Sequence, residues 1–156
     1  MTLLSLDPGF RYFGWAAFSG KTLQKAGRID NRTEEELFRL TQPPIFTGLV
    51  DVIEMFQWET ATAVIEFPVV RVSTPNTEAL LKLSSACGAY TSLLQAAGFS
   101  VEWVFPSTWK GSVPKKIMCG RIVDKLSSSE YSCIDKPRDH NVLDAIGVGL
   151  WKIQRL

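Results

Sequence analysis

The sequence predicts an α/β protein built on a mixed five-stranded sheet flanked by helices. Short apolar runs typical of strands follow one another closely in the first 30 residues. Further along the chain, such runs alternate with longer segments of helical periodicity. The first three strands are therefore expected to pair antiparallel, and the later strand–helix–strand crossovers to add parallel strands to the same sheet.

Three strands are predicted before the first helix. They are Leu3–Asp7, Phe13–Phe18 and Thr22–Ile29. Ser19-Gly20 lies between the second and the third and is typical of a tight turn, so these two strands are expected to form a hairpin.

A helix is predicted to begin at Thr33, because Thr33 and Glu36 have the spacing of a capping box. Pro43-Pro44 must interrupt this helix. It is expected to resume over Ile45–Phe56, where apolar residues recur on one helical face.

The second half of the chain alternates strands and helices. Thr62–Phe67 is the fourth predicted strand, Asn76–Ala97 a long helix that ends at Gly98, and Val101–Phe105 the fifth strand. A short helix is expected near Pro114, a polar loop over Ser127–Arg138, and a last helix over Asp139–Ile153. The tryptophans with apolar neighbours are predicted to lie in the core: Trp15, Trp58, Trp103 and Trp151.

Length and composition indicate one domain spanning residues 1–156, with 46% hydrophobic residues to form its core. No apolar run approaches the roughly 18 residues of a membrane span, and the residues before the first strand are not expected to form a signal peptide. Cys87, Cys119 and Cys133 are scattered and odd in number, which favours reduced thiols and a cytoplasmic location.

The net charge of +1 is unevenly distributed. Residues 1–70 hold 6 Lys/Arg and 9 Asp/Glu, a balance of −3, whereas residues 71–156 hold 11 and 7, a balance of +4. Within Pro106–Lys125 there are 5 basic residues and 1 acid. This basic segment fits either a solvated helix face or a contact with nucleic-acid phosphates.

Two carboxylates end apolar strands. Asp7 closes the first predicted strand and Glu66 follows the apolar core of the fourth. If these strands are parallel neighbours, both acids emerge at the same carboxyl edge, where ligands of α/β sheets bind. Two like charges held close together repel, and a hard divalent cation such as Mg²⁺ or Mn²⁺ resolves the conflict.

A third acid, Asp144, interrupts the apolar pattern of the last predicted helix. Ala145, Gly147 and Gly149 give that helix a small-residue surface, which allows a close approach to the sheet and brings Asp144 to its edge. His140, four residues earlier, lies on the same helical face as Asp144.

Each of these residues also has a simpler interpretation. Asp7 could cap the Pro-Gly turn that follows it. Glu66 could pair with Arg71, and His140 could be a solvent-exposed residue at a helix N-terminus. The three acids in this order, two at strand ends and one inside a helix, nevertheless favour a common site.

The motifs that carry these acids resemble one known family. "LSLDPGFRYFGWA", "VIEFP" and "DHNVLDAIGVGLW" resemble the RuvC Holliday-junction resolvases of the RNase H-like nuclease superfamily. "TEALLKLSSACGAY" is similar to the long helix after the second acid, and "FPSTWKGSV" to the strand-to-loop segment with a basic residue. "WKGSVPKK" and "DAIGVGLW" look closest to phage-type small resolvases. The resemblance covers nearly the whole chain.

The resemblance implies an RNase H-like sheet and a metal-dependent site. Asp7, Glu66 and Asp144 would be the ligands of two Mg²⁺ ions, for which Mn²⁺ substitutes. The family's fourth site residue, Asp or His, stands three positions before the last acid, where this chain has Asn141. We expect His140 to serve as the fourth catalytic residue, with Asn141 and Asp139 as alternatives.

The resemblance also implies contacts with DNA phosphates. The candidate residues are Arg71, Lys110, Lys115, Lys116 and Arg121, of which Lys110 has the strongest family match. Trp109 could stack on a base, although a core or interface role is favoured. The family's aromatic wedge, which unstacks the centre of a junction, has no assigned counterpart after Glu66.

The function implied is a crossover junction endodeoxyribonuclease of DNA recombination and repair. It would cleave Holliday junctions and related branched DNA by paired symmetric nicks that leave 5′ phosphates. Two nicks require two sites, hence a homodimer. The helix Asn76–Ala97 offers an apolar stripe for the dimer contact, which could equally pack on the sheet; it consists of Leu80, Leu83, Cys87 and Leu94. Alternatives are a nuclease of the same fold acting on structured RNA and a non-catalytic module that binds branched DNA. An ATPase of the sugar-kinase or actin type is disfavoured, because no second Gly-rich motif is present.

Overall fold

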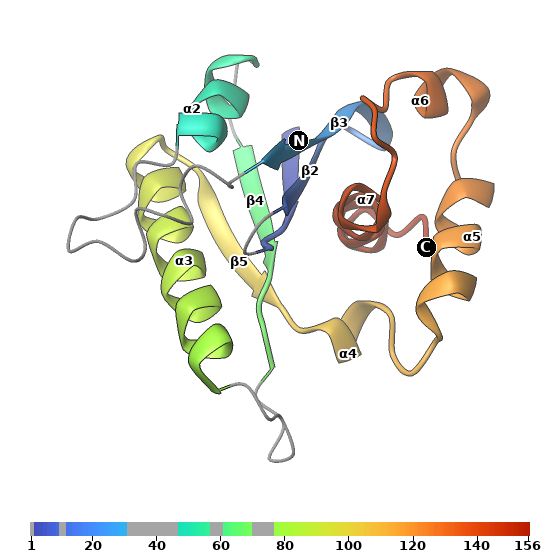
Figure 1. The fold of residues 1–156 in the computed structure, drawn as a ribbon. Helices are drawn as coiled ribbons and strands as arrows, with labels where there is room; N and C mark the ends of the chain where they lie inside the picture. The colour runs from blue at the N-terminus through green and yellow to red at the C-terminus, as the bar shows by residue number, and fades with distance from the viewer. Residues whose placement is uncertain (1, 10–11, 31–46, 57–60, 70–76) are drawn as a thin grey trace.

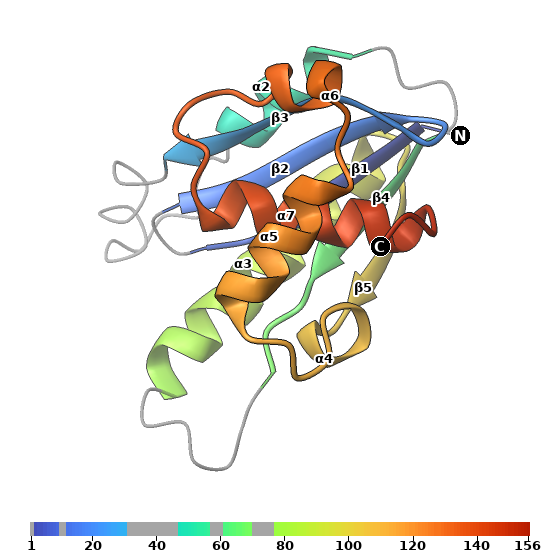
Figure 2. The same cartoon turned by 90° about the vertical axis from the view of Figure 1, so that its right-hand side faces the viewer.

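The fold was analysed in a computed structural model that describes residues 2–9, 12–30, 47–56, 61–69 and 77–156 (Figure 1). The predicted helix at Thr33, the Pro43-Pro44 interruption, Trp58 and Arg71 lie outside these residues. Within them, the predicted architecture is confirmed: a mixed five-stranded sheet with helices on both faces (Figures 1 and 2).

The strands follow the sheet order β3-β2-β1-β4-β5. Their bounds are β1 Thr2–Asp7, β2 Tyr12–Ser19, β3 Thr22–Asp30, β4 Ala61–Glu66 and β5 Ser100–Val104. The β1–β2 and β2–β3 pairs are antiparallel, whereas β4 pairs parallel with both β1 and β5. The predicted hairpin is formed, and Gly20 in its turn has a φ of 58°, a conformation that glycine adopts without steric cost.

Six helices are described. Their bounds are α2 Thr47–Glu54, α3 Thr77–Ala96, α4 Pro106–Trp109, α5 Lys115–Asp124, α6 Ser128–Ser132 and α7 His140–Lys152. Helices α2 and α3 cover one face of the sheet, and α7 covers the other with α5 outside it (Figure 1). No helix in the described part of the chain has both the length and the apolar character of a membrane span.

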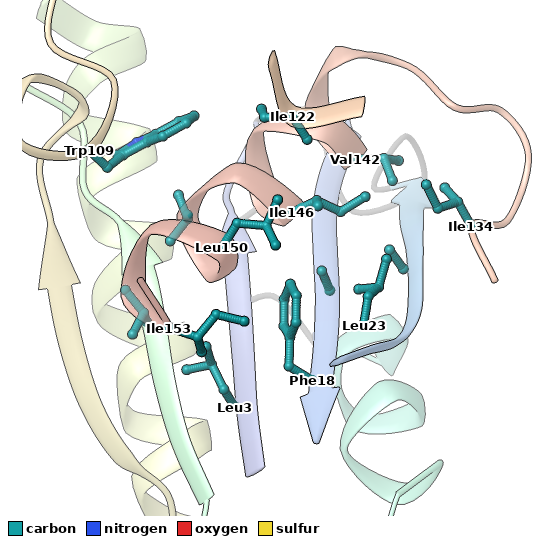
Figure 3. Close-up of a cluster of buried hydrophobic side chains, with 14 of the residues drawn as sticks. Leu3, Phe18, Leu23, Trp109, Ile122, Ile134, Val142, Ile146, Leu150 and Ile153 are labelled. Carbon is teal, nitrogen blue, oxygen red and sulfur yellow. The ribbon is translucent and has the colours of Figure 1, made fainter. Parts of the chain in front are cut away.

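Each face of the sheet has its own apolar core, because alternate strand residues point to opposite faces. On the α7 face, Leu3 and Phe18 pack with Ile146 and Leu150, and Ile122 of α5 closes the cluster (Figure 3). The other core joins residues of β1, β2 and β4 to α2 and α3, and contains Cys87 and Leu94 of the predicted α3 stripe. Burial raises the pKa of the Cys87 thiol to about 12.

Two local predictions are wrong, and one short helix lies where none was predicted. The region predicted as a polar loop contains α6, because Ser127 and Glu130 form a capping box. The short helix α4 was not predicted; Pro106 at its first position favours the helical turn. Trp103 was placed in the core, yet 54% of it is exposed, because β5 is an edge strand and Trp103 stacks on Phe67 outside the core.

Helix α7 lies unusually close to the sheet. A Cβ added at Gly149 would collide with the Phe18 ring, and one added at Gly147 would lie 2.6 Å from the Trp109 ring. At the other end of the helix, a Cβ on Gly14 of β2 would collide with the Asn141 carbonyl. The small-residue surface predicted from the sequence is therefore the contact surface between α7 and its neighbours.

Gly149→Ala is expected to destabilise the protein by about 1–3 kcal/mol, because the added methyl group has no space against Phe18. The matched control is Gly88→Ala in α3, where an added Cβ meets nothing within 4 Å. This control should raise stability by up to about 1 kcal/mol through helix propensity alone. Urea unfolding followed by circular dichroism measures both, and an unaltered Gly149→Ala would contradict the close packing.

Candidate functional site

Three carboxylates converge at the carboxyl edge of the sheet. Asp7 ends β1 and Glu66 ends β4, and the parallel register pairs Leu6 with Ile65, so both acids leave the sheet side by side. Asp7 pairs with Gly14 across β1 and β2, and Gly14 is in contact with the first turn of α7. This contact brings Asp144, in the second turn of α7, to the same edge.

A buried hydrogen bond holds α7 at this position. The Ser5 hydroxyl of β1 donates to the Ala145 carbonyl at 2.7 Å. Ser5 is two residues before Asp7, and Ala145 directly follows Asp144. The bond therefore joins β1 to α7 next to Asp7 and Asp144. Ser5 is a buried polar residue whose hydroxyl is satisfied by this contact.

A lysine lies between two of the acids. The Lys110 Nζ atom is 3.4 Å from Glu66 Oε1 and 3.7 Å from Asp144 Oδ2. A second ammonium group, that of Lys115, lies 3.6 Å from the same Asp144 oxygen, but its side chain is 56% exposed. The two lysines thus partly neutralise the three carboxylates.

Trp109 belongs to the same site. Its indole Nε1 donates a hydrogen bond to Glu66 Oε2 at 2.5 Å, and its ring lies 4.7 Å from the Lys110 ammonium group. Helix α4 presents Trp109 and Lys110 from consecutive positions, and the Lys110 N–H bonds back to the Pro106 carbonyl. The favoured core role of Trp109 is correct, since it is buried, but its hydrogen bond to Glu66 was not predicted.

Two of the acids have raised pKa values. Burial, followed by the negative charges of Glu66 and Asp144, raises the pKa of Asp7 well above its ordinary value. Burial also raises the pKa of Glu66, and Lys110 and Trp109 only partly offset it. Oδ1 of Asp144 is buried and has no hydrogen-bond partner among the described residues. Buried carboxylates with raised pKa values and an unused acceptor are typical of functional sites.

The three candidates for a fourth site residue lie at the start of α7. His140 is exposed on its first turn. Asp139 is the N-cap: it accepts from the Asn141 and Val142 amides at 3.1 and 3.3 Å and forms an ion pair with Arg28 at 2.5 Å. Burial acts to raise the pKa of Asp139, but these bonds lower it overall. Asp139 therefore has a structural role at this position.

The predicted phosphate contacts separate into two groups. Lys110 and Lys115 contact the acids directly. Lys116 and Arg121 are exposed on α5, and neither forms an ion pair with any residue that the structure describes. The basic segment is thus partly a solvated helix face and partly a lining of the acidic site.

The sheet order, the mixed pairing and the helices on both faces define an RNase H-like fold. Among solved structures, Thermus thermophilus RuvC in complex with Holliday junction substrate is similar at a TM-score of 0.65 and 18% identity, covering 97% of this chain and 92% of that chain. Fowlpox virus resolvase in complex with Holliday junction DNA is similar at a TM-score of 0.59 and 13% identity, covering 99% and 97%. No family model and no curated protein sequence matches this chain.

Asp7→Asn is expected to stabilise the protein at pH 7 by roughly 1–2 kcal/mol. The reason is that the neutral amide removes a carboxylate charge that burial and the charges of Glu66 and Asp144 disfavour. The folded state raises the pKa of Asp7, so it binds the proton more tightly than the unfolded chain does. The stability that this group contributes is present at low pH and is lost as the pH rises above the unfolded value of about 3.8.

Urea unfolding of the wild type and Asp7→Asn at pH 7 and near pH 4 measures this effect. The gain in unfolding free energy should shrink towards pH 4. Asp51→Asn, on the exposed side of α2, is the matched control and should change little at either pH. If Asp7→Asn were less stable than the wild type at pH 7, the Asp7 carboxylate would not be a buried charge that opposes folding.

Proposed function

We propose that this protein is a metal-dependent endonuclease that cleaves Holliday junctions and related branched DNA. The observation that carries the proposal is the convergence of three carboxylates at one sheet edge beside Lys110 and Lys115. Its support is the fold, since two similar structures are resolvases in complex with junction DNA. The whole chain would act as a single nuclease domain.

The donor set suits a hard divalent cation. Asp7, Glu66 and Asp144 offer only oxygen ligands, which Mg²⁺ and Mn²⁺ prefer. The unpartnered Asp144 Oδ1 is an available acceptor. Burial, followed by repulsion from the neighbouring carboxylates, raises the pKa of Asp7, and burial also raises the pKa of Glu66. Among the described residues, no group of three or more His, Cys, Asp or Glu side chains is arranged to hold a metal in this structure. Lys110 lies between two of the acids.

Asp7, Glu66 and Asp144 would hold two Mg²⁺ ions. Bound there, the ions would activate a water for attack on a phosphodiester and stabilise the leaving 3′ oxygen. Trp109 keeps Glu66 in position through its indole hydrogen bond. His140, exposed at the first turn of α7, would orient the attacking water or accept its proton. The product would carry a 5′ phosphate.

Basic residues would hold the DNA backbone around the cut. Lys110 and Lys115 already lie at the acids, and Lys116 and Arg121 extend the positive surface along α5. Phosphate contacts of this kind position the substrate without reading its sequence. Arg71 is proposed for the same role from the sequence.

Paired symmetric nicks require two active sites, and we propose a homodimer with twofold symmetry. The predicted α3 stripe divides in the structure: Cys87 and Leu94 are fully buried against the sheet, whereas Leu80 and Leu83 are half-buried. Leu81 of the same helix is 64% exposed. An α3 contact between copies would therefore use the exposed side of the helix.

Cleavage of a synthetic four-way junction in Mg²⁺ tests the proposal. The wild type should produce symmetric nicks with 5′ phosphates, and Asp7→Asn and Glu66→Gln should reduce the rate by at least about 100-fold. Asp51→Asn should cleave like the wild type. Faster cleavage of a structured RNA than of the junction would favour the RNA nuclease, and tight junction binding without cleavage would favour a non-catalytic module.

Lys110→Gln is expected to bind Mn²⁺ roughly 3- to 10-fold more tightly than the wild type in the absence of DNA. The reason is that the Lys110 ammonium group lies where it repels a cation bound by Glu66 and Asp144. Isothermal titration calorimetry measures the affinity. Lys115→Gln, whose side chain is more exposed and contacts only Asp144, should have a smaller effect. Equal or weaker binding by Lys110→Gln would show that the lysine does not oppose the metal.

A further inference from the structure

A concave site lies beside the acids. It is a cavity of about 440 Å³ between the end of α4, one face of α5 and the C-terminal residue. Its apolar lining consists of Trp109, Val113, Met118 and Leu156. Its charged lining consists of Lys110, Arg121, Asp124 and Lys125. We call it the α5 pocket.

The lining combines an apolar surface with an excess of positive charge. Trp109 and Met118 are buried and Val113 is half-buried, so they form the inner surface. Arg121 and Lys125 are exposed and form no ion pair with a described residue. At the pocket, Arg121 and Lys125 stand against one acid, Asp124, while the Lys110 ammonium group already contacts Glu66 and Asp144. A ligand that satisfies both features carries a flat apolar group and a negative charge, as a nucleotide does.

The α5 pocket and the acidic site share a wall. The Trp109 indole lines the pocket and donates to Glu66, and Lys110 lines the pocket while its ammonium group contacts Glu66 and Asp144. A DNA strand with a phosphate at the acids would therefore have a neighbouring nucleotide within reach of the pocket.

We propose that the α5 pocket binds one unstacked nucleotide of the DNA strand held at the acids, with its base against Trp109, Val113 and Met118 and its phosphate near Arg121. This inference rests on the proposed nuclease function. Extruding a base costs least where pairing and stacking are already interrupted, as at a branch point. The pocket thus favours branched DNA over continuous duplex.

Filling the pocket tests the inference. In Val113→Trp the added ring occupies the cavity, and the control Val123→Trp places the same ring on α5 outside the pocket lining, at a residue that is 36% exposed. Binding to a four-way junction and to a duplex of equal length is measured by fluorescence anisotropy in EDTA, so that the strands stay uncut. Circular dichroism establishes that both variants fold.

Val113→Trp should bind the junction about 5- to 50-fold more weakly than the wild type, the range that loss of one base contact gives, and should bind the duplex equally well. Val123→Trp should match the wild type on both. Arg121→Gln, an exposed substitution with little risk to folding, should weaken junction binding several-fold. The inference is overturned if Val113→Trp binds the junction as tightly as the wild type does, which is the result expected if the pocket serves another partner or none. It is also overturned if Val113→Trp loses affinity equally for the junction and the duplex.

Photocrosslinking locates the nucleotide. Thymidines around the branch are replaced one at a time by 5-iododeoxyuridine, and the crosslinked peptides are identified by mass spectrometry. At least one position should crosslink to Trp109 or Met118 in the wild type and not in Val113→Trp. Crosslinks only to residues outside the pocket refute the inference while leaving the nuclease function intact. A wild type that binds the junction no better than duplex refutes both.

Discussion

The close approach of α7 to the sheet is the constraint on which the site depends. Glycines at positions 14, 147 and 149 leave no space for a side chain between the helix and its neighbours. The hydrogen bond from Ser5 to the Ala145 carbonyl holds the two elements together beside Asp7 and Asp144. Bulkier residues at positions 14 or 149 would move the helix away from the sheet and separate Asp144 from the acids at the strand ends, whereas position 147 faces Trp109 and Ile122.

This arrangement concentrates the negative charge of three carboxylates in a site with little access to water. Burial and mutual repulsion raise the pKa of Asp7, and the protein compensates only in part with Lys110 and Lys115. A carboxylate cluster of this kind opposes folding at neutral pH and favours cation binding. The same negative charge that makes the site unfavourable for stability is what the proposed metal binding would use.

Lys110 and Trp109 connect the acidic site to its surroundings. The short helix α4 presents both residues at Glu66, and the same two residues line the α5 pocket. The charge balance of the acids, the proposed contacts with the DNA backbone and the proposed nucleotide contact thus depend on one helical turn. Pro106 at the first position of that turn favours its formation.

The sequence by itself determined the order of strands, the hairpin, the main helices and the three acids, because these follow from local periodicity, turn residues and polar residues inside apolar segments. The sequence also contains a signal for helix α6, because Ser127 and Glu130 have capping-box spacing within a polar segment. Only the tertiary structure decided that Trp109 bonds to Glu66, that Lys110 lies between two acids, and that Trp103 is exposed at the sheet edge. These depend on contacts between segments far apart in the chain, which local patterns do not encode.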